Sequence, residues 1–404
     1  MAKGFFFSLP SDSVNKSLLP LVDELCDTHQ ITYFNTSDYR DRIASKALFR
    51  EYTTYAEGYR TVNIAPHISY FQFADILLRT AAYVIEDICK EIAFEKPDFI
   101  LHSHLAPWGK LAARYFNIPA VSLFSTFVLD EKIMLPRLKQ LRESNKDGSV
   151  ENIQDAVTLY RKLMKLQQQL SIGEQPDIWD LYVNREAVNI SFIHPLLQPQ
   201  RDLLAQNFHF VGFHMPPFPE LASRDTIYIS MGTVMNKDVT LFKKIIQVLT
   251  QFNHTAIISI GNAIQAADLG PLPPQIQICA YVDQLAILQQ CAVFITRGGM
   301  ASVQEAICTH TPMLVIPDIP EQQITAERIS ELQIGINAGN NPEPEDIESA
   351  LREILTNREK YLLALRDINA GIQGNNACKT AASLIDDYLS QPTEQTTNLF
   401  IHQN

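Results

Sequence analysis

A pair of glycines inside the run T-R-G-G-M-A-S-V-Q-E-A, from Thr296 to Ala306, is the feature of this sequence that best predicts chemistry. A strand-like apolar segment precedes the run, and helix-forming residues follow it. Glycine lets the backbone approach a ligand closely, and the free N–H groups at a helix start attract anions. Arg297, directly before Gly298 and Gly299, could grip a phosphate through its guanidinium. The run indicates either an anion site or an ordinary strand-to-helix turn with a surface arginine.

Further polar segments follow strand-like segments in the same half of the chain. They are Ser230-Met231-Gly232-Thr233, Tyr281-Val282-Asp283-Gln284, and Pro317 to Gln323 with Glu321 and Gln322. Ligands of doubly wound sheets bind at the carboxyl ends of strands. Hydroxyls and glycines suit a pyrophosphate, Glu305 could accept from ribose hydroxyls, and Glu321 with Gln322 suits the hydroxyls of a sugar. Asp283 and Glu305 could equally cap helices.

Strand-like and helical segments alternate along most of the chain, which predicts an α/β fold of parallel sheets. Strands are predicted near residues 4–10, 31–35, 98–103, 120–124, 188–192, 208–211, 226–230, 256–260, 276–279, 292–295 and 313–316. Helices are predicted near residues 16–28, 68–94, 108–116 and 376–389, with an exposed helical excursion over 135–170.

The segment His214 to Pro219 holds three prolines in four residues and interrupts both helix and strand. A length of 404 residues also suits two domains of roughly 200 residues each. We therefore predict an N-terminal domain over 1–214, a linker over 215–225 and a C-terminal domain over 226–375. A helix over 376–390 and a loose tail over 391–404 follow.

Composition narrows the class of protein. A net charge of −12 and a pI near 5.3 argue against a nucleic-acid partner. The sequence has no apolar stretch long enough to span a membrane. Six cysteines without CxxC pairs suggest reduced thiols in a cytoplasmic protein.

Taken together, these motifs resemble the macrolide-type branch of the UDP-glycosyltransferases. In the second half the resemblance rests on S-M-G-T-V at 230–234, Y-V-D-Q at 281–284, the R-G-G run and I-P-D-I-P-E-Q-Q-I-T-A-E-R at 316–328. In the first half it rests on V-N-K-S-L-L-P-L-V-D-E-L at 14–25, L-A-P-W-G-K at 105–110 and I-P-A-V-S-L-F-S-T-F at 118–127.

The resemblance implies the GT-B architecture, two Rossmann-like domains with the active cleft between them and a terminal helix that returns to the first domain. It implies that the donor diphosphate lies against Ser230, Gly232, Thr233, Ser302 and the turn of Arg297, Gly298 and Gly299. The base and ribose would contact Val282, Gln284 and Glu305, and the transferred sugar would contact Glu321 and Gln322. No metal or cofactor is implied beyond the nucleotide-sugar co-substrate, because helix-start amides can neutralise the departing diphosphate.

The chain departs from the family's pattern at several positions. Arg297 stands where the family has histidine, and Ala301 where it has asparagine. The family's general base, a histidine, and the aspartate that orients it are replaced by Ser13 and Ser103. General base catalysis contributes roughly 10²–10⁴-fold, so this loss matters.

Asp12 and His104 lie next to these serines and are candidates for a substitute base. The preferred interpretation of His102 and His104 is two loop histidines without a special task, and a metal pair is less favoured. The sequence thus predicts an enzyme that moves a hexose from a UDP-sugar to a hydroxyl of a lipophilic small molecule. The alternative is a degenerate homologue that binds nucleotide or a partner without transfer. The oligomeric state is not determined by the sequence.

Overall fold

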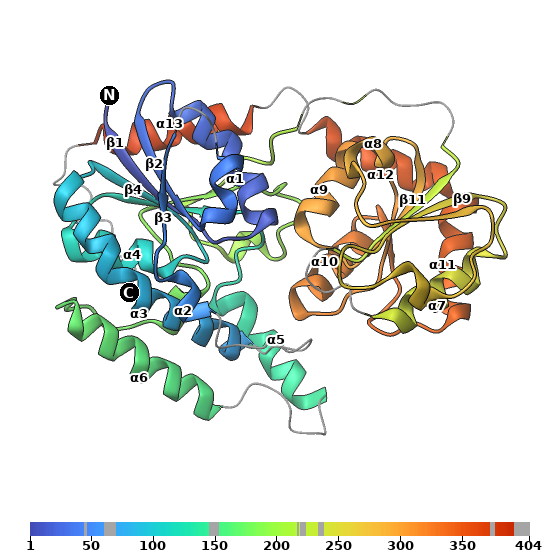
Figure 1. The fold of residues 1–404 in the computed structure, drawn as a ribbon, viewed down its shortest axis with the longest axis horizontal. Coiled ribbons are helices and arrows are strands. Elements are labelled where there is room, and N and C mark those ends of the chain that lie inside the picture. The colour runs from blue at the N-terminus through green and yellow to red at the C-terminus, as the bar shows by residue number, and fades with distance from the viewer. Residues whose placement is uncertain are drawn as a thin grey trace. The chain divides into compact units, whose positions relative to one another are not determined.

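The computed structural model describes residues 1–43, 47–59, 70–144, 153–215, 218, 224–232, 238–371 and 376–391. The chain divides into two compact units, each with its own parallel sheet (Figure 1). Unit 1 comprises residues 1–214 together with 375–404, and unit 2 comprises residues 215–374.

The sheet of unit 1 has the strand order β3-β2-β1-β4-β5-β6-β7, and every neighbouring pair is parallel. The described strands are β1 (Lys3–Phe7), β2 (Gln30–Asn35), β3 (Leu48–Glu51), β4 (Phe99–Ser103), β5 (Ala120–Phe124), β6 (Val188–Ser191) and β7 (Phe208–Phe210). Phe5 and Phe7 enter one hydrophobic cluster and Phe6 another, because successive side chains of a strand point to opposite faces. Both faces of the sheet are therefore buried, as expected for a parallel sheet.

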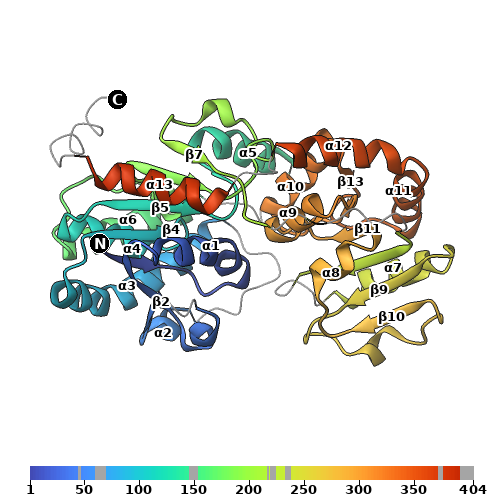
Figure 2. The same cartoon turned by 90° about the horizontal axis from the view of Figure 1, so that it is seen from above.

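Helices cover the two faces of this sheet. The described helices are α1 (Asp12–Leu25), α2 (Tyr55–Tyr59), α3 (Tyr70–Glu95), α4 (Pro107–Phe116), α5 (Glu131–Ser144), α6 (Ile153–Gln169) and α13 (Ala377–Leu389), with short 3-10 helices at Ser37–Arg42, Ile178–Leu181 and Arg201–Leu203. Residues of α1 and α13 share one cluster with Phe6, whereas α3, α4 and α6 pack with Phe5 and Phe7. The C-terminal helix α13 thus lies beside α1, in unit 1 (Figure 2).

The sheet of unit 2 has the order β10-β9-β8-β11-β12-β13, again parallel throughout. Its described strands are β8 (Thr226–Ser230), β9 (Thr255–Ser259), β10 (Ile276–Cys279), β11 (Cys291–Thr296), β12 (Met313–Val315) and β13 (Gly335–Asn337). The helices are α7 (Val239–Leu249), α8 (Gln284–Leu288), α9 (Met300–Cys308), α10 (Pro320–Glu331), α11 (Pro344–Thr356) and α12 (Arg358–Ala370), with a 3-10 turn at Ala266–Leu269. The central strand β11 is completely buried, which explains its unbroken apolar sequence.

Every predicted strand is present to within a few residues, and the predicted α/β fold class is confirmed. The edge strands β3 and β13 were not predicted. Each has only three or four residues, and Leu48 in β3 is 47% exposed, so neither gives a strong apolar signal. The predicted excursion over 135–170 corresponds to two described helices, α5 and α6.

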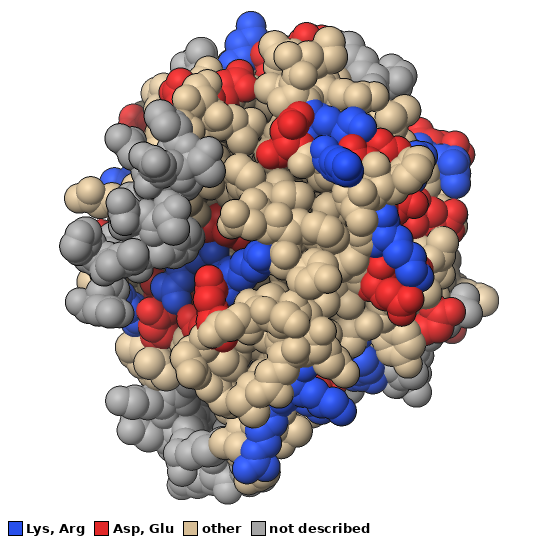
Figure 3. Space-filling view, turned by 90° about the vertical axis from the view of Figure 1, so that its left-hand side faces the viewer, with Lys and Arg blue, Asp and Glu red and all other residues tan. Residues whose placement is uncertain are grey.

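All six cysteines carry free thiols, and three of them are buried. In the described residues no helix is long and apolar enough to cross a membrane. On the face shown in Figure 3, the acidic (red) and basic (blue) side chains are intermixed. Several helices carry ion pairs one turn apart, such as Lys90 with Glu86 at 2.8 Å.

The packing of α13 predicts that a cavity-forming substitution in this helix destabilises unit 1. Ile385 in α13 is fully buried, so I385A should lower the free energy of unfolding of unit 1 by about 2–5 kcal/mol. The matched control is L363A on α12, where the side chain is 57% exposed and the change should stay within about 0.5 kcal/mol. Hydrogen exchange resolved by peptide would check this, and equal loosening of unit 2 in I385A would contradict it.

Candidate functional site

The glycine turn joins the end of β11 to the start of α9. Gly298 has a φ of +84°, and a Cβ there would lie 2.8 Å from Cγ1 of Val315, so only glycine fits. Gly299 is the N-cap of α9, and no side chain caps the helix. The first amides of α9 are therefore available to an anion, and the helix dipole favours negative charge there.

Arg297 is buried beneath this turn. Its side chain is 5% exposed. Its Nη1 donates to the carbonyl of Ile316 at 3.3 Å, and its Nη2 lies 3.6 Å from Oδ2 of Asp238. The alternative interpretation as a surface arginine is wrong. The guanidinium instead contacts the segments that follow β12 and precede α7.

A hydrogen-bonded group beside the turn links three of the predicted site residues. The amide nitrogen of Gln284 donates to Oγ of Ser302 at 3.1 Å and to the carboxylate of Glu305. Its amide oxygen accepts from the hydroxyl of Tyr228 at 3.2 Å. Tyr228 was not predicted, because an aromatic residue in a buried strand reads as core; its ring stacks on Phe294. Burial raises the pKa of Tyr228 to about 12, so its hydroxyl stays a donor.

The capping alternative holds for one of the two acidic residues. The Asp283 side chain accepts from the amide of Ala286 at 3.2 Å and caps α8. Glu305 lies in the middle of α9, is 1% exposed, and so caps nothing. Val282, half-buried, and Tyr281, 65% exposed, lie directly before this cap.

The loop after β8 reaches the same edge of the sheet. Ser230 pairs in register with Thr296 on the neighbouring strand, which places the end of β8 next to the glycine turn. Ser230 is half-buried, and Gly232 has a φ of +80°. Thr233 lies outside the described residues.

Glu321 and Gln322 lie in the first turn of α10, after β12. Gln322 accepts from the amide of Asp318 at 2.8 Å, so its side chain oxygen supports the local turn. Glu321 is half-buried, and its backbone carbonyl accepts from the hydroxyl of Thr325. The four loops of unit 2 thus follow β8, β10, β11 and β12, at the carboxyl edge of one parallel sheet.

In unit 1 Ser13 follows β1, and Ser103 is the last residue of the neighbouring strand β4. Ser13 is exposed in the first turn of α1, and its Oγ lies 3.0 Å from that of Ser11. Ser103 ends β4, is fully buried, and accepts from the amide of Leu105 at 3.3 Å. Parallel strands bring both positions to the carboxyl edge of this sheet.

Asn15 organises the loop before Ser13 and was not predicted as a site residue. Its amide nitrogen donates to the carbonyls of Leu9 at 3.1 Å and Ser11 at 2.7 Å. Its amide oxygen accepts from Tyr33 and from Asn35. Burial raises the pKa of Tyr33, so the phenol remains a donor. An asparagine in a helical segment gives no sequence signal for such a role.

The two candidate substitute bases have different surroundings. Asp12 is half-exposed, accepts from the hydroxyl of Tyr39 at 3.1 Å and forms an ion pair with Arg42. His104 is 2% exposed, its ring stacks on Phe124, and its Nδ1 lies 3.3 Å from the carbonyl of Leu123. Burial lowers the pKa of His104 to about 4, which makes the imidazole a weak base.

The interpretation of His102 as a loop histidine is wrong. His102 lies within β4, is fully buried, and has its Nε2 3.1 Å from Oε1 of Glu186. Within the described part of the chain, no cluster of three or more His, Cys, Asp or Glu residues is arranged to hold a metal ion.

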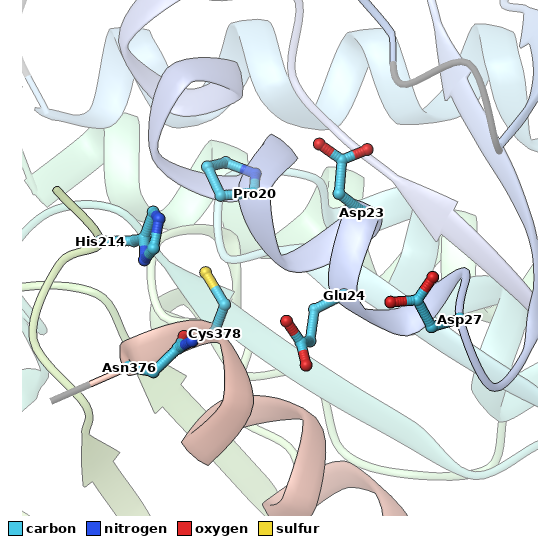
Figure 4. A pocket seen from close by; sticks show the side chains of 7 residues that line it. All are labelled: Pro20, Asp23, Glu24, Asp27, His214, Asn376 and Cys378. Atoms are coloured by element: carbon cyan, nitrogen blue, oxygen red, sulfur yellow. The ribbon is translucent and has the colours of Figure 1, made fainter. Parts of the chain in front are cut away.

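A separate pocket of about 260 Å³ lies in unit 1 between α1 and the start of α13 (Figure 4). Its lining comes from the C-terminal half of α1 and the turn after it, from His214, and from the N-cap and first turn of α13: Pro20, Asp23, Glu24, Asp27, His214, Asn376 and Cys378. None of the predicted site residues contributes to it.

Comparison with known proteins gives a consistent result. Residues 243–396 match the family described as Erythromycin biosynthesis protein CIII-like, C-terminal domain. The chain is 25% identical over 415 aligned residues to a Bacillus subtilis protein named Uncharacterized UDP-glucosyltransferase YojK, covering 98% of this chain and 99% of that protein. These similarities support a macrolide-type GT-B glycosyltransferase.

Two solved structures show the same fold. The glycotransferase of kitacinnamycin superposes with a TM-score of 0.79 at 22% identity, over 96% of this chain and 98% of that one. The glycosyltransferase VinC, solved in complex with DTDP, gives a TM-score of 0.72 at 14% identity, over 96% and 99% of the two chains. The predicted GT-B fold, two Rossmann-like domains with parallel sheets, is confirmed.

The positive φ and tight packing at Gly298 predict that this glycosyltransferase tolerates no side chain there. G298A should destabilise unit 2 by about 2–5 kcal/mol, through left-handed strain and overpacking against Val315. The adjacent G299A is the control, because Gly299 has a φ of −61° and open space around its Cβ. It should cost about 1 kcal/mol or less, as a poorer N-cap. Chemical denaturation would measure both, and equal losses would refute the explanation.

The buried His104 predicts a dependence of stability on pH. In the unfolded chain its imidazole takes up a proton near pH 6.5, whereas in the folded protein its pKa is about 4. Stability is thus fully present above about pH 6.5 and falls by roughly 3 kcal/mol towards pH 4 through this group. H104Q should lack that part of the pH dependence in urea unfolding measured from pH 7 to pH 4. A variant with the same slope as the wild type would show that His104 is not the source.

Proposed function

We propose that this protein transfers a hexose from a UDP-sugar to a hydroxyl of a lipophilic small-molecule acceptor. The observation that supports this best is the uncapped start of α9, with its glycine turn, next to the Gln284–Glu305 pair. One end of this arrangement suits an anion and the other suits vicinal hydroxyls, which is the polarity of a nucleoside diphosphate.

In this proposal the diphosphate lies against the first amides of α9, with Ser302 and Ser230 beside it. The ribose hydroxyls donate to Glu305, and Gln284 holds that carboxylate in place. The base contacts the backbone at Val282, where the exposed ring of Tyr281 offers an apolar face for stacking. Glu321 and Gln322 lie on the neighbouring loop, where a sugar attached to the diphosphate would be read.

The comparisons support a nucleoside-diphosphate sugar as the donor and a natural product as the acceptor. The VinC structure holds DTDP, and the matched family is named for erythromycin biosynthesis. Helix-start amides can stabilise the charge of a departing diphosphate by preorganised dipoles, so the proposed transfer invokes no metal or other cofactor. The relative affinities for uridine and thymidine diphosphates decide between the two bases.

Activation of the acceptor requires a base other than Ser13. Of the two candidates, Asp12 fits better, because its carboxylate is half-exposed and adjacent to Ser13, whereas His104 is buried and weakly basic. The contacts from Tyr39 and Arg42 fix the orientation of the Asp12 carboxylate.

The replacement of both dyad positions by serine favours a second candidate function. A glycosyltransferase homologue could bind a nucleotide, or a partner, without transferring sugar. The donor site of unit 2 would then be retained while the chemistry of unit 1 is lost.

A paired measurement of binding and turnover tests both functions. Calorimetry should show UDP binding, and UDP release from UDP-sugars should appear with phenolic and macrolide acceptors. D12A should lower kcat about 10²-fold or more with UDP affinity unchanged, because a general base contributes that much. K16A, an exposed change on the same helix, is the control. Absence of UDP and TDP binding would refute the donor, and binding without turnover would establish the degenerate alternative.

A further inference from the structure

Arg297 connects three loops of the donor site rather than standing at its surface. It follows β11, whose neighbours in the sheet are β8 and β12. Its guanidinium donates to the carbonyl of Ile316, directly after β12, and faces Asp238, directly before α7. The planar guanidinium of Arg297 thus connects the segments that follow the three adjacent strands β8, β11 and β12.

Burial makes the guanidinium depend on its carboxylate partner. The side chain of Arg297 is 5% exposed, and its Nε has no hydrogen-bond partner among the described residues. A buried charge is costly unless it is paired. Asp238 supplies the countercharge from a surface position, with 49% of its side chain exposed.

Asp238 performs two tasks with its two carboxylate oxygens. Oδ1 accepts from the amide of Leu241 at 2.9 Å and caps α7, while Oδ2 faces Arg297. The start of α7 and the glycine turn are thereby held at a fixed separation.

We propose that Arg297 is a positioning residue, which acts through Asp238 and the Ile316 carbonyl to fix the anion-binding turn. The proposal rests on the proposed function, since it assigns the turn to the donor diphosphate. It differs from direct phosphate binding by Arg297, in which Asp238 competes with the diphosphate for the same guanidinium.

The sign of the effect at Asp238 separates these two roles. Asn caps helices as well as Asp, so D238N removes the charge of the pair and keeps the cap. If Arg297 positions the turn, D238N weakens UDP binding about 3- to 10-fold, although it removes a negative charge near an anion site. Uridine affinity should change less than twofold, because uridine lacks the diphosphate. A gain in UDP affinity in D238N would overturn the proposal.

R297K tests whether the planar guanidinium is required, since lysine keeps the charge but cannot contact both the Ile316 carbonyl and Asp238. It should weaken UDP binding as D238N does, and the D238N/R297K pair should be less than additive. The matched control is E343Q, which removes the acidic partner of the Lys244–Glu343 ion pair at the cap of α11 and should leave UDP affinity unchanged.

Hydrogen exchange in the ligand-free protein tests the positioning without relying on nucleotide. Peptides covering residues 296–303 should exchange faster in D238N and R297K than in wild type or E343Q. Unchanged exchange would overturn the positioning role, whatever the protein binds. Faster exchange in a protein that binds no UDP would support the positioning role while refuting the proposed donor.

Discussion

The close contact between Gly298 and β12 is the constraint on which the candidate site depends. A Cβ at Gly298 would meet Val315 at 2.8 Å, so the turn passes tightly over the neighbouring strand. That passage lets α9 begin immediately after β11, with its first amides at the carboxyl edge of the sheet. The proposed anion-binding property of the site follows from this backbone path, and no charged side chain has to supply it.

The side chains around the turn complete a site with two chemically distinct ends. At one end are the free amides of α9, Ser230 and Ser302. At the other, Gln284 joins Ser302 to the buried carboxylate of Glu305, and Tyr228 supports Gln284 from β8. A polar network of this kind keeps its members in one arrangement, because each loses a partner if it rotates.

Unit 1 differs from unit 2 in this respect. Its loop between β1 and α1 is held by many hydrogen bonds, but Ser13 and Ser103 stand where a titratable pair is expected. Asn15 holds the loop between β1 and α1 through several hydrogen bonds, among them those with Leu9, Ser11 and Asn35. These hydrogen bonds are present although neither Ser13 nor Ser103 is a base. Order in such a loop therefore does not require the chemistry that the family places there.

The sequence by itself determined the order of most strands and helices, and it placed the four loops of unit 2 at the ends of strands. It could do so because apolar runs, glycine pairs and proline clusters have local causes. It did not reveal the edge strands β3 and β13, because their pairing is decided by a neighbouring strand and not by their own composition. It also left a surface position open for Arg297, and it placed His102 in a loop.

Only the tertiary structure decided those cases. Burial of Arg297 depends on Asp238 and Ile316, which lie far from it in the sequence. The lowered pKa of His104, and hence its weak basicity, results from the loss of solvent around the buried ring. Residue type and spacing thus predicted which groups gather at the site. Their exposure, charge partners and pKa values are set by contacts between distant segments, which no local pattern encodes.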